Sequence, residues 1–188
     1  MVNLWKLIWT LGKQIGSSFT IRQLAQDSRI PYTSAYRTIQ ENKKLFVLEK
    51  KGPSLLCSLN WCDPLIGSYL AVAEREIANV VIENNPFMSK LQQQLPSGEY
   101  ACIVTNPSSN LRQDSQDKLN LIIITEKPIR KKQFAKIQHE FSKQVNIELI
   151  SLEDWNKKLS SEGTKKDSTF LADCIILCGE DFFWSWMR

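Results

Sequence analysis

Apolar residues recur at helical spacing near the start of the chain, which predicts an amphipathic helix over residues 3–15. They are Leu4, Leu7, Ile8, Leu11 and Ile15. A second helix is predicted to begin after Thr20 and to run through Gln26, because Gln23 completes a capping-box pattern with Thr20. Pro31 suits the start of a third helix, where its missing N–H would have no partner, and that helix is predicted from about Tyr32 to Lys43.

Two short apolar runs follow and flank a turn that contains glycine and proline. Residues 45–49 and 55–59 are the apolar runs, and Lys50-Lys51-Gly52-Pro53-Ser54 lies between them. This pattern predicts a β-hairpin with a basic turn. Short helices followed by such a hairpin are typical of a winged helix-turn-helix domain, which we expect to occupy residues 1–60.

Beyond residue 60 the pattern predicts two helices and then strands that alternate with helices. A linker is expected over residues 61–96, with a long helix from Asp63 to about Glu83 and a short one from Pro86 to Gln94. Residues 97–188 are expected to form a small α/β domain, so that the whole chain is α+β. Its expected segments are strands at 100–105, 119–125 and 145–150, helices at 130–144, 152–159 and 170–176, a polar loop at 106–117 and an aromatic tail at 181–186.

Two of these segments leave alternatives open. The long helix can serve as a connecting rod or as the contact surface of a homodimer. The tail Phe182-Phe183-Trp184-Ser185-Trp186 can dock on the core of its own domain or form a surface for a partner, since exposed aromatic patches mark interfaces.

Charge is distributed unevenly along the chain. The net charge is +4, yet the residues through Asn60 include nine basic and three acidic side chains, a net charge of +6. The remaining residues include 15 basic and 17 acidic side chains, a net charge of −2. This asymmetry indicates a module that binds a polyanion, joined to a part that does not.

The third predicted helix carries the candidate reading surface for double-stranded DNA. In a helix-turn-helix the second helix of the motif enters the major groove and contacts base edges. Ile30, Ala35 and Ile39 have the spacing to face the core, which leaves polar side chains for the groove and the backbone. The expected DNA-binding residues are Arg22, Tyr32, Thr33, Ser34, Tyr36, Arg37, Gln40, Lys50 and Lys51. Arg37 and Gln40 suit base contacts, whereas Arg22, Lys50 and Lys51 suit phosphate contacts.

Other chemistries find little support in the sequence. No apolar run approaches the ~20 residues of a membrane span, and the N-terminus lacks the features of a signal peptide. The five cysteines form no CxxC pair, and His139 is the single histidine, so no metal site or cofactor is expected. We therefore expect a soluble, cytoplasmic protein with free, buried thiols. Arg130-Lys131-Lys132 is interpreted as a solvated surface rather than a second nucleic-acid patch.

The second half resembles a known family of domains. Residues 98–125 and 145–150, with the ending 171–180, resemble a small nucleotidyltransferase domain of the polymerase-beta superfamily. Archaeal proteins that join a winged helix-turn-helix to such a domain have the same layout. They share a Leu-Asn and Asp-Pro-Leu junction, matched here by Leu59-Asn60 and Asp63-Pro64-Leu65. The resemblance covers nearly the whole chain and rests on the order of segments. It implies that a nucleotide is a candidate ligand.

Departures from the family pattern imply that this domain is inactive. The turn Thr105-Asn106-Pro107-Ser108-Ser109 lacks the glycine of the Gly-Ser turn that holds a triphosphate in active members. The two carboxylates that would bind Mg²⁺ fall on Lys118 and Asn120. Phosphoryl transfer needs the metal to neutralise phosphate charge, and a lysine repels that ion. The resemblance therefore implies a pseudoenzyme with no catalytic residue.

Three nearby carboxylates leave an alternative open. Asp114 and Asp117 lie just upstream, and Glu148 lies near the position of a third family carboxylate. A shifted alignment would bring Asp117 into the site, but its partner would then be Leu119, which cannot bind metal. The expected function is a sequence-specific DNA-binding transcriptional regulator whose second domain serves sensing or assembly. The alternatives are an active Mg²⁺-dependent nucleotidyltransferase and a protein-interaction adaptor.

Overall fold

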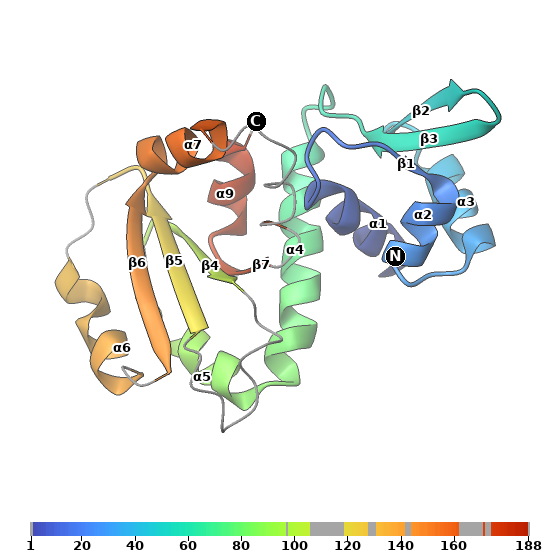
Figure 1. The fold of residues 1–188 in the computed structure, drawn as a ribbon. Coiled ribbons are helices and arrows are strands. Elements are labelled where there is room, and N and C mark those ends of the chain that lie inside the picture. Colours follow the sequence, from blue (N-terminus) through green and yellow to red (C-terminus); the bar gives the residue numbers. More distant parts are fainter. Residues whose placement is uncertain are drawn as a thin grey trace.

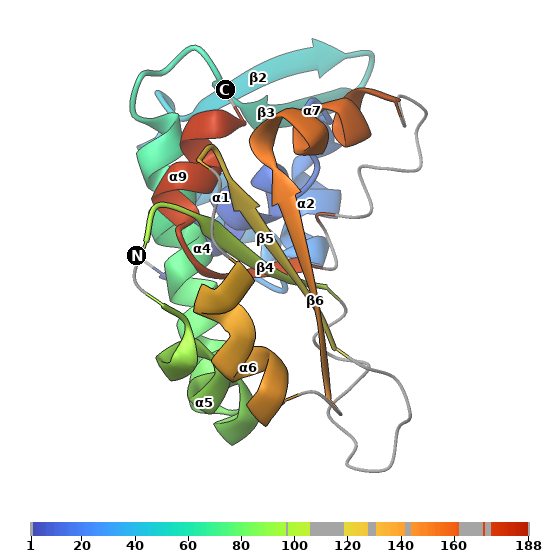
Figure 2. The ribbon, with the colours of Figure 1, turned by 90° about the vertical axis from the view of Figure 1, so that its left-hand side faces the viewer.

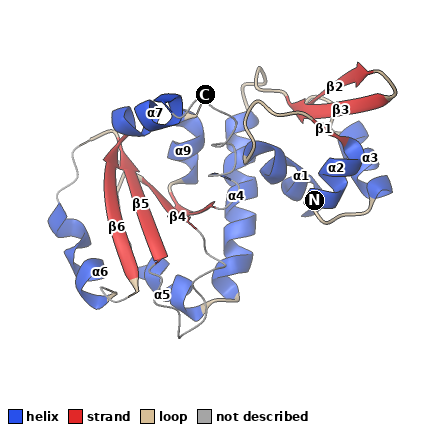
Figure 3. Cartoon of the chain, viewed as in Figure 1, coloured by secondary structure: helices blue, strands red, loops and turns tan. Residues whose placement is uncertain are grey.

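The chain folds as a mixed α+β protein with two β-sheets (Figures 1 and 3). This computed structural model describes residues 2–96, 98–105, 119–127, 131–141, 144–161, 171 and 174–187. The predicted loop at 106–117, with Asp114 and Asp117, and Lys118 lie outside the described residues.

The first sixty residues form three helices and a small antiparallel sheet. The sheet has the strand order β1-β3-β2. The elements are α1 (Val2–Gly12), β1 (Phe19–Thr20), α2 (Ile21–Asp27), α3 (Tyr32–Glu41), β2 (Phe46–Lys51) and β3 (Ser54–Leu59). The predicted hairpin is confirmed, with Phe46 opposite Leu59 and Lys51 opposite Ser54.

The first helix is shorter than predicted. It ends at Gly12 rather than Ile15, and Ile15 is 36% exposed instead of joining the apolar stripe. The following residue, Lys13, turns inward to a buried carboxylate on another helix. Hydrophobic periodicity does not indicate this ion pair, because it depends on a residue far away in the sequence.

The predicted capping box at the start of α2 is confirmed. Thr20 Oγ1 accepts a hydrogen bond from the Gln23 N–H at 3.2 Å, and Gln23 Oε1 accepts one from the Thr20 N–H at 3.1 Å. Two backbone N–H groups that would lack helical partners are satisfied in this way.

Thr20→Ala is expected to lower the free energy of unfolding by about 0.5–2 kcal/mol, the usual cost of losing an N-cap side chain. Urea denaturation followed by circular dichroism measures the change. Ser18→Ala, at an exposed position two residues earlier, is the matched control and should leave the midpoint unchanged. Equal midpoints for Thr20→Ala and the wild type would contradict the stabilising role of the cap.

The second part of the chain contains a four-stranded sheet with helices on both faces (Figure 2). The strand order is β6-β5-β4-β7, in which only the β5–β6 pair is parallel. The elements are α4 (Ile66–Glu83), α5 (Pro86–Gln94), β4 (Ala101–Thr105), β5 (Leu119–Thr125), η1 (Lys131–Phe134), α6 (Ala135–Glu140), β6 (Val145–Ser151), α7 (Leu152–Ser161), β7 (Cys174–Cys178) and α9 (Glu180–Trp186).

Both faces of this sheet are buried, because alternate residues of each strand belong to two different hydrophobic clusters. On β4, Ala101 and Ile103 pack with α4 and α9, whereas Cys102 and Val104 pack with α5 and α6. A sheet covered on both sides is built from continuous apolar strands rather than alternating ones. This explains why the sequence of β4 is apolar from Ala101 to Val104.

The predicted helix over 170–176 is wrong in its second half. Cys174–Cys178 is strand β7, which pairs antiparallel with β4. A short apolar run does not distinguish a buried strand from a buried helix by periodicity, and here two adjacent isoleucines and the following Gly179 favour the strand. The helix predicted over 130–144 is also shorter than expected, since a 3₁₀ turn at Lys131–Phe134 precedes α6.

The long helix α4 lies between the two halves of the molecule (Figure 1). It packs against α1 on one side and against α9 and β7 on the other. Its buried residues are Ile66, Gly67, Leu70, Ala71, Ala73, Glu74, Ala78 and Ile82. The predicted rod is therefore a central part of the core rather than a free connection.

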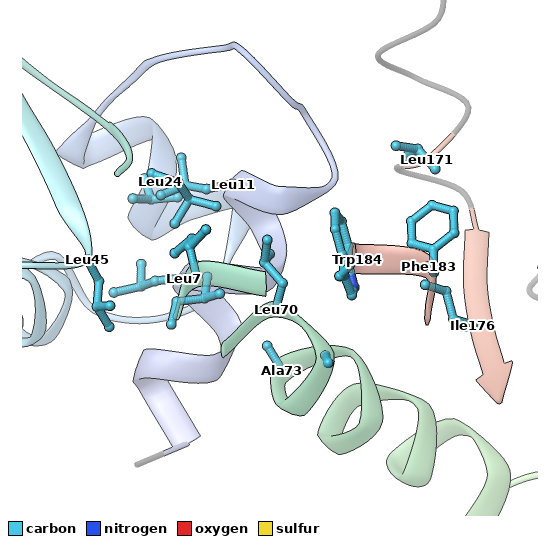
Figure 4. Packing of buried hydrophobic residues seen from close by; sticks show 14 of the residues in the cluster. Leu7, Leu11, Leu24, Leu45, Leu70, Ala73, Leu171, Ile176, Phe183 and Trp184 are labelled. Carbon is cyan, nitrogen blue, oxygen red and sulfur yellow. The ribbon is translucent and has the colours of Figure 1, made fainter. Parts of the chain in front are cut away.

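One hydrophobic cluster extends through α4 into both halves (Figure 4). Leu7 and Leu11 of α1 belong to it, and Figure 4 shows Leu70 of α4 between Leu7 and Trp184 of α9. Phe183 is 1% exposed next to Trp184. The aromatic tail is thus a helix that docks on the core of the chain. This is the first of the two alternatives given above. Phe182 nevertheless remains 37% exposed.

A buried ion pair connects the residue after α1 with α4 and β7. Lys13 Nζ donates hydrogen bonds to Glu74 Oε1 on α4 and to the Cys174 carbonyl on β7, both at 3.0 Å. Glu74 Oε1 also accepts the Ile176 N–H at 3.0 Å. Lys13 Nζ lies 5.3 Å from the centre of the Trp9 ring, in a cation–π contact. The side chains are 3% and 0% exposed, so both charges are held away from water.

Candidate nucleic-acid interface

Helix α3 is anchored by one apolar face. Ala35 and Ile39 are fully buried, and Ile30, just before the helix, is 8% exposed, as the spacing predicts. Pro31 precedes the helix in an extended conformation, and α3 begins at Tyr32 as predicted but ends at Glu41, two residues before the predicted Lys43. Arg29 reverses the chain between α2 and α3 with a φ of 53°, and the Ile30 N–H then bonds back to the Ala25 carbonyl.

The opposite face of α3 presents the predicted DNA-binding side chains to solvent. Tyr32 and Tyr36 are 53% and 43% exposed, and their rings stack with centroids 6.3 Å apart. Thr33 and Arg37 are exposed, whereas Ser34 and Gln40 are half-buried. Large aromatic side chains gain by burial, so a stacked, exposed tyrosine pair on a helix is a surface suited to a partner.

Arg37 is held by an acidic neighbour on the same helix. Arg37 Nε donates a hydrogen bond to Glu41 Oε1 at 2.7 Å, and this contact raises the pKa of Arg37 above its usual value. The pair borders a groove of about 430 Å³ between the start of α1 and α3, which Asn3, Leu4 and Thr38 also line. Glu41 therefore competes with DNA bases for the guanidinium of Arg37, which we expect to contact base edges.

The β2–β3 hairpin carries the second basic element. Lys50 and Lys51 are exposed at its tip, and Gly52 turns the chain there with a φ of 60°. Figure 1 shows this hairpin at the same end of the molecule as α3. Arg22 is exposed on α2. The structure thus brings the α3 residues together on one face and places the hairpin lysines at the end of a separate projection.

Sequence reasoning missed two parts of this surface. The first is Glu41, which the i,i+4 spacing from Arg37 signals. The second is the contribution of Asn3 and Leu4 to the groove, for which a sequence pattern offers no signal because it depends on how α1 packs against α3.

In the second half, Asn120 places an amide on strand β5 at a position where the family resemblance predicts a carboxylate. Asn120 is exposed on β5 and accepts a hydrogen bond from the Asn146 amide at 3.2 Å. Glu148 is exposed on β6 opposite Ile122, so it shares a sheet face with Asn120. Within the described residues, no cluster of three histidine, cysteine or acidic side chains could hold a metal ion.

No helix in the described part of the chain is both long enough and apolar enough to cross a membrane. Comparison of this chain with protein-family models, with curated proteins and with solved structures gives no match. The function must therefore be inferred from the chemistry of the surface described above.

Proposed function

We propose that this protein binds double-stranded DNA through α3 and the β2–β3 hairpin and acts as a transcriptional regulator. The observation that carries the proposal is the contrast between the two faces of α3. One face is fully buried at Ala35 and Ile39, and the other exposes stacked tyrosines, a threonine and an arginine. This surface lies in the part of the chain that has a net charge of +6.

The order of elements supports a winged helix-turn-helix interpretation of residues 1–60. Helices α2 and α3 are joined by a tight turn, and the β2–β3 hairpin follows, with β1 completing its sheet. In this arrangement α3 would lie in the major groove. The hydroxyls of Tyr32 and Thr33 would contact phosphates, and Arg37 and Gln40 would reach base edges. Lys50 and Lys51 would contact the adjacent backbone.

For the second half we propose a nucleotidyltransferase-like domain without catalytic activity, used for sensing or assembly. Asn120 supports this, because a neutral amide, here hydrogen-bonded by Asn146, stands at a position where the resemblance expects a Mg²⁺-binding carboxylate. Labelled nucleoside triphosphates with Mg²⁺ or Mn²⁺ provide the test. Nucleotidyl transfer by the wild type that disappears in Glu148→Ala would overturn the proposal of an inactive domain.

Removal of the hairpin lysines is expected to weaken DNA binding and to reduce its dependence on salt. For Lys50→Ala/Lys51→Ala, the slope of log K against log salt should become shallower by about 0.9 for each phosphate that is no longer neutralised. Arg37→Ala should weaken binding to a selected site by about tenfold or more while leaving nonspecific binding nearly unchanged. Fluorescence anisotropy with a duplex selected from a random library measures both effects.

The control is Lys132→Ala/Lys136→Ala, which removes two exposed lysines from the second half. It should bind like the wild type, because the deleted charges lie outside the proposed interface. Glu41→Gln should bind more tightly, since it frees Arg37 and removes a negative charge from the groove. Absent or salt-independent binding by the wild type would refute the DNA proposal and favour the adaptor alternative.

A further inference from the structure

Two cysteines from distant parts of the sequence lie opposite each other in the four-stranded sheet. Cys102 of β4 and Cys178 of β7 are direct partners in the antiparallel ladder. Residues so paired have Cα atoms roughly 4.5–5.5 Å apart. Disulfides span Cα separations of roughly 4.4–6.8 Å. A disulfide between these residues is therefore compatible with the existing backbone.

A β-bulge directs both side chains to the same face. The next pair in the ladder is Ile103 with Ile176, so Leu177 is an extra residue on β7. Without the bulge, Cys178 would point to the same side as Cys174 and Ile176, because side chains alternate along a strand. Instead it packs in the cluster that contains Cys102 and Leu177. Bulges commonly redirect a side chain in this way.

The bulge is held by its neighbours. Gln92 of α5 donates a hydrogen bond to the Leu177 carbonyl at 2.9 Å. On the other side, Gly179 has a φ of 75° and packs directly on the Tyr100 backbone. The position of Cys178 is thus set by contacts from two other elements, which indicates a defined site rather than a loose strand end.

The two thiols differ in access to solvent. Cys102 is fully buried. Cys178 is half-buried and lines a pocket of about 300 Å³, which Arg75 and Glu180 also border. Arg75 and Glu180 form an ion pair with each other. Cys178 is therefore the more accessible of the two residues.

The two thiols also differ in acidity. The neighbouring Cys102 thiol, with a smaller contribution from Tyr100, lowers the pKa of Cys178, although burial and the Glu180 charge oppose this. Burial raises the pKa of Cys102 well above its usual value. Thiolates are the reactive form of cysteine, so this pair combines an accessible nucleophile with a protonated neighbour.

We propose that Cys178 and Cys102 form a peroxide-responsive dithiol site, in which Cys178 reacts with a small hydroperoxide and Cys102 resolves the product as a disulfide. In the first step the Cys178 thiolate attacks one peroxide oxygen and the O–O bond breaks. The peroxide is reduced, its second oxygen leaves and takes up a proton, and Cys178 becomes a sulfenic acid. In the second step the Cys102 sulfur attacks the Cys178 sulfur and forms the S–S bond. The S–O bond breaks, and the departing hydroxide combines with the proton of the Cys102 thiol to give water.

The test treats the full-length protein with hydrogen peroxide, blocks the remaining thiols with an alkylating agent, and maps the peptides by mass spectrometry. We expect a Cys102–Cys178 linked peptide in the wild type, reversed by dithiothreitol. In Cys102→Ala the disulfide should be absent, and a sulfenic acid on Cys178 should be trapped by dimedone. Cys62→Ser, which removes an exposed thiol elsewhere, should behave like the wild type.

The linked peptide is measured in the wild type, so the proposal can be tested even if the Cys102→Ala variant is unstable. Buried Cys57 serves as an internal reference, because burial raises its pKa to about 12 and it should stay reduced. Preferential oxidation of Cys62, or oxidation of Cys178 to sulfinic acid without any linked peptide, would overturn the proposal.

Discussion

Glu74→Ala is expected to lower the free energy of unfolding by about 3–5 kcal/mol, the usual cost of removing one partner of a buried ion pair. The substitution leaves the Lys13 amine without its carboxylate partner at a site where its side chain is 3% exposed. It also removes the acceptor of the Ile176 N–H. Urea denaturation of the intact chain, followed by tryptophan fluorescence, measures the change.

Two further variants test the physical reason. Glu76→Ala removes an exposed carboxylate two residues along the same helix and should cost little. Lys13→Met/Glu74→Leu replaces both charges by apolar groups of similar size and should recover part of the stability. A cost below about 1 kcal/mol for Glu74→Ala would mean that the pair is not held as buried charges.

Gly179→Ala is expected to destabilise the protein by about 2–5 kcal/mol. The left-handed conformation at φ 75° costs roughly 1–2 kcal/mol for a residue with a Cβ. That Cβ would also lie 1.9 Å from the Tyr100 carbonyl oxygen and 2.8 Å from the Ala101 Cα. Both are backbone atoms, so relief requires a shift of β4, and overpacking of this kind costs roughly 1–3 kcal/mol more.

Two other glycines separate the conformational cost from the steric one. Gly16 and Gly52 also have positive φ, but a Cβ at either would meet nothing within 4 Å. Gly16→Ala and Gly52→Ala should therefore cost only about 1–2 kcal/mol. Thermal unfolding of the three variants side by side gives the comparison. Equal destabilisation at all three positions would show that β4 can shift away from a Cβ at Gly179 at little cost in free energy.

The elements that follow from local rules were predictable from the sequence. The capping box at Thr20, the basic turn at Gly52 and the core spacing of Ala35 and Ile39 each depend on residues close together in the chain. Their physical causes act within one or two helical turns. The exposed face of α3 was predictable for the same reason, because a helix with one buried face leaves the other in solvent.

Features that depend on distant residues were not predictable. The helix prediction fails at β7 because the identity of this strand depends on pairing with β4, over seventy residues earlier. The inward turn of Lys13 depends on Glu74, and the facing thiols depend on an extra residue in one strand. Hydrophobic patterning records burial but not the partner that provides it.

Helix α4 has a consequence for how this protein can be divided. Its first half belongs to the cluster shared with α1 and α9, and its second half to the cluster beneath the opposite face of the sheet. A cut near residue 60 would leave α1 without the surface that covers Leu7 and Leu11, so the two halves are not interchangeable modules. The orientation of α3 relative to the large sheet is set by packed side chains rather than by a tether. The two halves are therefore expected to fold correctly only when they are kept together in one chain.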